Sequence, residues 1–193
     1  MKKTVLISTV IALTVSFASF SQNKATIPTD FSKGNIITND NESFDGYIKE
    51  LFKTQGNIQF INNEGVKKTF TADALQSFTT NNTVYITYLS DFYKTIVTGD
   101  KGNLFQKVTD NNGKLITVGT ESVVASTTDG KIGDYYFQLK KDGDLILVTK
   151  KNFETVFSEN LSTNNSVLSA IKSKQLNYSQ ITETVEKLNN SSN

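Results

Sequence analysis

The sequence of 193 residues contains no arginine, histidine, cysteine or tryptophan, and its single proline is Pro28. Without histidine or cysteine the chain can form neither a Ser-His-Asp triad nor a cysteine nucleophile, a disulfide or a zinc finger. Only Asp, Glu, Ser, Thr, Tyr, Lys and backbone groups remain for acid–base or nucleophilic chemistry. The composition therefore excludes the commonest catalytic arrangements and does not indicate a function by itself.

The absence of arginine also limits the binding partners. Lysine does not replace the planar guanidinium in the bidentate recognition of phosphate or guanine. The chain has 20 basic and 19 acidic residues, so it lacks the basic field that attracts polyanions. We expect no nucleic-acid partner.

The first 21 residues are typical of a signal peptide. They begin with two basic residues, Lys2 and Lys3, and continue with an apolar run at 5–17. Small residues precede the expected cleavage site, at Ala18, Ser19 and Ser21. We expect cleavage before Gln22, export through the Sec pathway, and a location in the periplasm, the outer envelope or outside the cell. An uncleaved anchor is the weaker alternative, because the run is shorter than the roughly 20 apolar residues that span a bilayer. We therefore expect no membrane span after cleavage.

The region 34–150 shows the pattern of an antiparallel β protein, with short apolar runs and Gly-containing turns roughly every ten residues. The pattern predicts strands at 35–39, 44–51, 57–61, 66–71, 77–79, 83–89, 93–98, 104–109, 114–118, 122–125, 134–140 and 145–149. Segments rich in Asn, Asp and Gly predict hairpin turns at 62–65, 99–102, 110–113, 128–131 and 141–144.

The first five predicted strands, with a break at 72–74, follow the plan of a small SH3-like barrel, and the later strands indicate a β-meander. One continuous sandwich or curled sheet is the alternative for the whole region. In the strand 83–89, both alternating faces carry apolar side chains, including Tyr85 on one face and Ile86 on the other. This pattern predicts a central strand.

After Lys150 the spacing of apolar residues changes from 2 to about 3.6, which predicts helices. Asn152 is the expected N-cap of the first helix, and Asn177 that of the third, with Gln180 in the position of a capping box. The expected fold is mainly β (α+β), with two or three short C-terminal helices. Its parts are a signal peptide (1–21), a linker (22–33), an antiparallel β region (34–150), a helical tail packed on the sheet (151–189) and a frayed end (190–193).

Several short motifs follow one another in a recognisable order. They are Gly-Asn-Ile-Ile-Thr-Asn at 34–39, Gly-Tyr-Ile at 46–48, Asn-Ile-Gln-Phe at 57–60, the segment 72–78, Val-Thr-Gly at 97–99 with Leu-Phe at 104–105, and the tail 153–189. This order resembles a widespread family of short exported bacterial β-rich proteins with a helical C-terminal tail, whose function is uncharacterised. The resemblance implies an exported β-rich protein and brings no catalytic residues.

Two patterns of reactive side chains have simpler explanations. Ser169 and Lys172 match the S-x-x-K pattern of serine acyl-transfer enzymes, but the partner motifs are absent and a solvated helix face explains them. Asp142 with Asp144, and the segment 110–112, place oxygen ligands close together without the spacing of a Ca²⁺-binding EF loop. Turn formation explains both, so we expect no metal and no cofactor.

Carboxylates and tyrosines give the remaining candidates. Hydrolysis of a glycan would need two acids in one cleft, and no spacing selects a pair among Asp45, Glu50, Glu121 and Asp134. The tyrosines suggested as a binding surface for sugars or apolar side chains are Tyr85, Tyr88, Tyr93 and Tyr136. The alternative, favoured because leucine is scarce, is that these rings fill the core.

We therefore expect a protein that is not an enzyme, and that acts as an exported binding or structural module of the cell envelope. An envelope protein or a glycan would be its partner, and its oligomeric state stays open. The alternative is a carboxylate-dependent envelope hydrolase acting on glycan or peptidoglycan.

Overall fold

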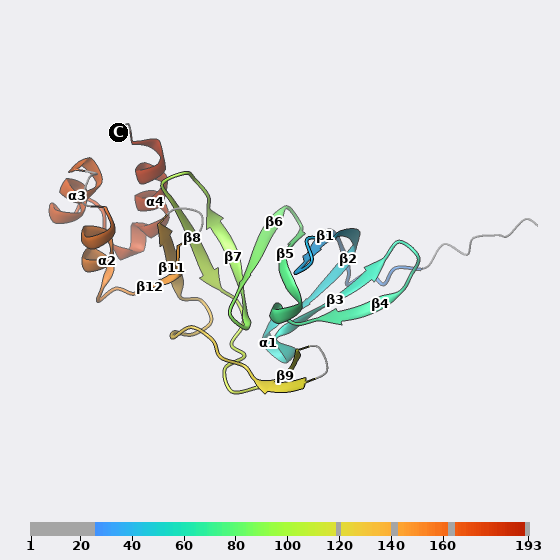
Figure 1. Ribbon diagram of the computed structural model, residues 1–193. Helices are drawn as coiled ribbons and strands as arrows, with labels where there is room; N and C mark the ends of the chain where they lie inside the picture. The colour runs from blue at the N-terminus through green and yellow to red at the C-terminus, as the bar shows by residue number, and fades with distance from the viewer. Residues whose placement is uncertain (1–25, 119–120, 140–142, 162–164, 192–193) are drawn as a thin grey trace, which may run out of the picture.

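The computed structural model describes residues 26–118, 121–139, 143–161 and 165–191 (Figure 1). The predicted signal peptide and the last two residues of the predicted frayed end lie outside these ranges. Within them, no helix has both the length and the hydropathy required to cross a membrane. The fold is mainly β with a few short C-terminal helices, as predicted.

Every predicted strand is present, with ends that differ by a few residues. The strands are β1 (Ser32–Thr38), β2 (Ser43–Leu51), β3 (Asn57–Asn62), β4 (Lys67–Phe70), β5 (Leu75–Thr80), β6 (Thr83–Tyr88), β7 (Asp91–Val97), β8 (Gly102–Lys107), β9 (Leu115–Val118), β10 (Glu121–Val124), β11 (Tyr135–Leu139) and β12 (Ile146–Val148). The helical elements are α1 (Phe52–Gln55), α2 (Phe153–Asn160), α3 (Asn165–Lys172) and α4 (Ile181–Asn190), with 3₁₀ turns η1 (Ala72–Ala74) and η2 (Tyr178–Gln180).

Ten strands form one antiparallel sheet in the order β12-β11-β8-β7-β6-β5-β1-β2-β3-β4. β1 pairs with both β2 and β5, and η1 separates β4 from β5, which is the strand order of an SH3-like barrel. The sheet nevertheless continues from β5 into β6, so these five strands are one end of a single large sheet. β6 lies between β5 and β7, which confirms the central strand predicted at 83–89.

The predicted meander is wrong for residues 110–131. β8 pairs with β11, with Leu104 opposite Phe137, and the intervening β9 and β10 form a separate two-stranded sheet. The turns 110–113 and 128–131 therefore lead into and out of this sheet and close no hairpin between neighbouring strands. The physical reason is burial, because β8 and β11 supply fully buried core residues while Leu115 of β9 remains 74% exposed.

The first end of the sheet encloses its own core. Residues from β1, β2, β3, β5, β6 and β7 meet there, namely Ile36, Ile48, Ile58, Phe60, Ala72, Leu75, Phe78, Tyr85 and Phe92. The one-turn helix α1, which the sequence did not predict, adds the Phe52 ring, whose centroid lies 5.3 Å from that of Tyr85 and 5.7 Å from that of Phe92. Aromatic rings therefore fill this core.

The other end of the sheet shares its core with the helices, which lie together at this end in Figure 1. The buried residues come from β8, β11, β12 and the tail: Leu104, Phe137, Val148, Phe153, Val156, Phe157, Leu161, Val167, Ala170, Ile171, Leu176, Ile181, Val185 and Leu188. The helical tail is therefore packed on the sheet. α4 extends to Asn190, and the side chain of Lys101 donates to the Ser191 carbonyl, so the frayed end predicted from 190 onward is wrong for these two residues.

Candidate functional site

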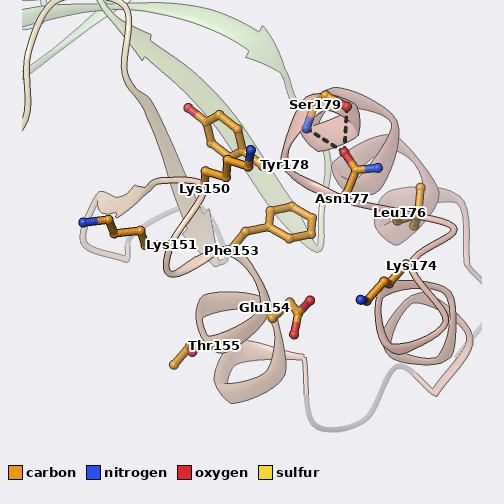
Figure 2. Close-up of a pocket in the computed structure, with 10 residues that line it drawn as sticks. All are labelled: Lys150, Lys151, Phe153, Glu154, Thr155, Lys174, Leu176, Asn177, Tyr178 and Ser179. Carbon is orange, nitrogen blue, oxygen red and sulfur yellow. Dashed lines mark hydrogen bonds between the residues drawn. The ribbon is translucent and has the colours of Figure 1, made fainter.

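A large cavity lies at the helical end of the molecule, between α2 and the segment that joins α3 to η2 (Figure 2). It encloses about 770 Å³, a volume typical of small-molecule sites. The residues that line it are Lys150, Lys151, Phe153, Glu154, Thr155, Lys174, Leu176, Asn177, Tyr178 and Ser179. We refer to it as the helical cleft.

One wall of the helical cleft is the turn between β12 and α2. Asn152 fixes this turn, because its Oδ1 accepts hydrogen bonds from the Thr149 backbone N–H (2.6 Å) and hydroxyl (2.9 Å), and its Nδ2 donates to the Leu147 carbonyl (2.8 Å). Asn152 occupies the predicted N-cap position of α2, but its side chain makes no capping hydrogen bond to that helix. The side chain instead holds the turn that presents Lys150 and Lys151.

The opposite wall begins where α3 ends. Lys174 has a φ of 61°, in the left-handed region that favours glycine or asparagine at a helix C-terminus. Its backbone N–H donates to the Ile171 carbonyl (2.9 Å), and that of Leu176 donates to the Ala170 carbonyl (3.1 Å). A lysine in this conformation is less favourable than glycine, and its side chain lines the helical cleft.

The predicted cap at Asn177 is confirmed. Asn177 caps η2, because its Oδ1 accepts a hydrogen bond from the Ser179 backbone N–H (3.0 Å). The predicted capping box with Gln180 does not form, because Gln180 Oε1 accepts from the Asn177 side-chain Nδ2 (2.7 Å) and not from its backbone N–H. Figure 2 shows the bonds that Ser179 makes to Asn177. They order the turn η2, which leads directly into α4.

The interior of the helical cleft combines an apolar floor with a polar rim. Phe153 and Leu176 are almost fully buried and belong to the shared core. The ring of Tyr178 meets that of Tyr135 edge to face, with 6.3 Å between the centroids. Burial, followed by the nearby charge of Asp134, raises the pKa of the Tyr178 hydroxyl, which therefore remains a neutral hydrogen-bond donor at physiological pH.

The charge of the helical cleft is positive, because its lining has three lysines and one glutamate. The ion pairs of the described residues involve none of Lys150, Lys151 and Lys174. In Figure 2, Lys150 and Lys174 lie on opposite sides of the floor, Glu154 lies beside Lys174, and Lys151 extends away. Ammonium groups, hydroxyls and an apolar floor together can hold an organic anion.

Three of the four tyrosines suggested as a binding surface lie in the core. Tyr93 is 0%, Tyr136 1% and Tyr85 7% exposed, so these three rings form no exposed patch. The Tyr85 ring stacks on Phe78, with 4.6 Å between centroids, and Tyr93 meets Tyr136 edge to face at 5.2 Å. Rings fill the space that leucine fills in other proteins, which is the alternative favoured from the sequence. Tyr88 is half-buried and donates to Asp144 Oδ1 (3.0 Å).

The four candidate carboxylates lie on separate parts of the molecule. Asp45 lies near the start of β2 and Glu50 near its end. Glu121 lies on the separate hairpin of β9 and β10, and Asp134 directly precedes β11. Glu50 shares a shallow hollow of about 290 Å³ with Asp30. The hydrogen bond from Lys49 is the main reason why the pKa of Asp30 is lowered, so Asp30 is not a proton donor at neutral pH. Neither the four dispersed carboxylates nor the Glu50–Asp30 hollow has the geometry of an acid–base pair in a cleft.

The remaining candidate groups are also dispersed. Ser169 and Lys172 are exposed on α3. Asp142 lies outside the described residues, and among those described no three Asp or Glu side chains come together as metal ligands. The helical cleft could not be predicted from the sequence, because its lysines belong to no motif. The one available signal, a lysine directly after the α3 pattern, is common in helical tails.

Comparison with known protein families, with curated proteins and with solved structures found no match to this chain. The resemblance to short exported bacterial proteins therefore stays a prediction.

Proposed function

We propose that this protein is a non-catalytic, exported binding module of the cell envelope, and that its helical cleft binds the carboxylate groups of an acidic glycan. Export rests on the basic, apolar and small-residue pattern of residues 1–21. The proposed ligand class rests on the chemistry of the cleft.

The observation that carries the proposal is a group of lysines around an apolar floor that form no ion pair with any residue the structure describes. Lys150 and Lys174 approach the floor from opposite walls, so one acidic unit between them contacts two ammonium groups. The Tyr178 ring provides an apolar surface for a sugar ring, and its hydroxyl provides a hydrogen-bond donor. Asn177 and Ser179 add polar groups of the kind that recognise sugar hydroxyls.

Lys174 supports the proposal in a second way. Glycine would fit its left-handed backbone without strain, whereas lysine costs on the order of 1 kcal/mol in this conformation. Unfavourable backbone conformations occur preferentially at functional sites. A charge needed at this point of the cleft would account for the lysine.

The test measures binding of trigalacturonate, a short acidic oligosaccharide, by isothermal titration calorimetry at low and high salt. We expect Lys150→Ala and Lys174→Gly each to weaken binding about fivefold, as loss of one partly screened charge contact does. Lys174→Gly should leave the melting temperature unchanged or higher, because glycine relieves the backbone. Lys68→Ala, an exposed lysine on the distant edge strand β4, is the matched control and should bind like the wild type.

Two comparisons define the ligand class. The neutral methyl ester of trigalacturonate should not bind, and tetraglutamate should bind more weakly than the sugar. Preference for tetraglutamate would assign the cleft to a protein partner. Absence of binding for both anions, or equal binding by the wild type and both cleft variants, would refute the proposal.

A further inference from the structure

Asp91 and Lys107 form a fully buried ion pair. They belong to the neighbouring antiparallel strands β7 and β8, and the side chains of both are 0% exposed. The Lys107 Nζ atom lies 3.1 Å from Asp91 Oδ2. The other ion pair of similar type, Lys49 with Asp30, lies on the surface.

The two carboxylate oxygens of Asp91 have different surroundings. Oδ1 accepts hydrogen bonds from the Thr109 hydroxyl (2.8 Å) and the Asn111 backbone N–H (3.0 Å). Oδ2 is buried, accepts no hydrogen bond within the described structure, and has the Lys107 amine as its neighbour. One oxygen is thus held by two donors, while the other lies next to a nucleophile.

Backbone and acidic groups orient the Lys107 amine. Its Nζ donates to the Thr128 carbonyl (3.0 Å) and lies 3.4 Å from the Gly130 carbonyl. Asp110 Oδ1, on the solvent side, is 3.9 Å from Nζ. Buried rings of Phe92, Tyr93 and Phe105 belong to the same strands, so bulk water is excluded from the pair.

Burial of two opposite charges is costly, and conversion of the ion pair into an amide and water removes both charges. An amine held against a carboxyl carbon in a fixed orientation reacts far faster than the same groups in solution.

We propose that Lys107 and Asp91 form an intramolecular isopeptide bond. The Lys107 nitrogen attacks the Asp91 Cγ atom, the Nζ–Cγ bond forms, and the Cγ–Oδ2 bond breaks. Of the three protons of the ammonium group, one stays on the amide nitrogen and two leave with Oδ2 as water. The reaction needs no oxidant or co-reactant, because the charged pair is converted into one amide and one water molecule.

The neighbouring groups have defined roles in this step. Thr109 and Asn111 donate to Oδ1, where negative charge develops when the amine attacks. Asp110 is the acceptor positioned to relay a proton from the amine towards the leaving oxygen. The bond would tie β7 to β8 covalently in a chain that has no cysteine. This inference is independent of the helical cleft and of its ligand.

The experiment is the intact mass of the folded chain without its predicted signal peptide, residues 22–193, followed by digestion with trypsin. We expect nearly all molecules to be lighter than the sequence mass by one water, about 18 Da. Because a modified lysine resists trypsin, residues 69–94 and 102–114 should appear as one branched peptide. A wild-type chain in which these peptides are separate and Lys107 is cleaved would overturn the proposal.

The digest also separates the isopeptide from other losses of similar mass. Cyclisation at Asp45-Gly46, Asp129-Gly130 or Asp142-Gly143 releases water as well, and cyclisation of an N-terminal Gln22 releases ammonia, but each maps to a different peptide. A water loss that maps only to an Asp-Gly sequence would refute the proposal.

Two variants test the chemistry. Asp91→Asn should lose ammonia, about 17 Da, instead of water, because the amide nitrogen then leaves. Lys107→Met keeps a side chain of similar length without the amine, and should show the full sequence mass. An Lys107→Met chain that still shows the water loss would contradict the assignment, whether or not this variant is less stable.

Discussion

The two ends of the sheet build their cores in different ways. At the β1–β5 end the strands curl around aromatic rings from their own faces, and the single turn α1 completes the enclosure. At the β8–β11–β12 end, the sheet face is covered by α2, α3 and α4, whose side chains supply most of the buried residues. The first end is therefore enclosed mainly by strands, whereas the second depends on a separate segment of chain.

This difference explains where the helical cleft lies. A sheet that curls on itself brings its side chains into direct contact, and the two hollows described at its rim, of about 370 and 290 Å³, are smaller than the helical cleft. Helices that dock on a sheet are joined by turns. In this protein a cavity remains between two of these connecting segments. The cleft forms between the turn before α2 and the segment before η2, and both are held by Asn side chains.

The largest expected effect comes from removing one core ring at each end. Phe78→Ala and Phe157→Ala each delete a ring that is at most 1% exposed, and should lower the free energy of unfolding by about 3–5 kcal/mol. Hydrogen exchange measured by mass spectrometry should rise around β1–β6 for Phe78→Ala, and in α2–α4 and β11–β12 for Phe157→Ala. Phe44→Ala, which removes a 43% exposed ring, is the control. Identical exchange patterns for the two core variants would show that the ends do not differ in this way.

A smaller effect concerns tyrosines in two of the core clusters. Burial is the main cause of the raised pKa of Tyr85, Tyr93 and Tyr136. The stabilisation by the neutral hydroxyls is fully present below pH 10 and is lost above it, because the unfolded chain then releases protons that the folded chain retains. Each buried tyrosine should lower the free energy of unfolding by about 1.4 kcal/mol per pH unit in this range.

Urea unfolding between pH 9 and 11.5 checks this expectation, with absorbance at 295 nm reporting phenolate formation. Tyr85→Phe and Tyr93→Phe should each reduce the slope of stability against pH, the first in the core of the β1–β5 end and the second in the cluster that Tyr93 forms with Phe105, Tyr136 and Leu145. If both slopes equal that of the wild type, the hydroxyls do not remain protonated in the folded protein.

The smallest expected effect is at the surface of the β1–β5 end. Lys49→Ala removes the hydrogen bond that is the main cause of the lowered pKa of Asp30. The Asp30 pKa, followed by the carboxyl ¹³C shift, should rise towards its ordinary value. Asp30 favours the folded state above the pKa of the unfolded chain, and this contribution is lost as pH falls through the lower folded value. The pKa difference between wild type and Lys49→Ala should shrink in high salt. An Asp30 pKa that is equal in the two proteins would contradict the assigned cause.

Much of the fold could be predicted from local patterns, but the pairing of distant strands and the burial of particular residues could not. Period-2 alternation located the strands, and a change to a period near 3.6 after Lys150 located the helices. The same patterns could not show that β8 pairs with β11, because two of the turn segments look like hairpin turns. Lys107 alternates in its strand like a solvated residue, yet it is fully buried beside Asp91.

The candidate site was less predictable than the fold. Tyrosines drew attention because they are large and clustered in sequence, but most of those named are core residues. The cleft lysines come from two segments more than 20 residues apart, and nothing in either segment indicates that they meet. Asn177 was predictable as a cap, because capping depends only on residues within one turn of helix.

The sequence by itself determined the type and order of the strands and of the C-terminal helices, because hydrophobic periodicity, turn residues and caps act over a few neighbouring residues. It also determined which catalytic side chains are missing. Tertiary structure alone decided which strands pair, which tyrosines are buried, that Lys107 meets Asp91, and that Lys150 and Lys174 line one cleft. These outcomes depend on contacts between distant segments, which are set by the burial of the whole apolar surface and leave no local pattern in the sequence.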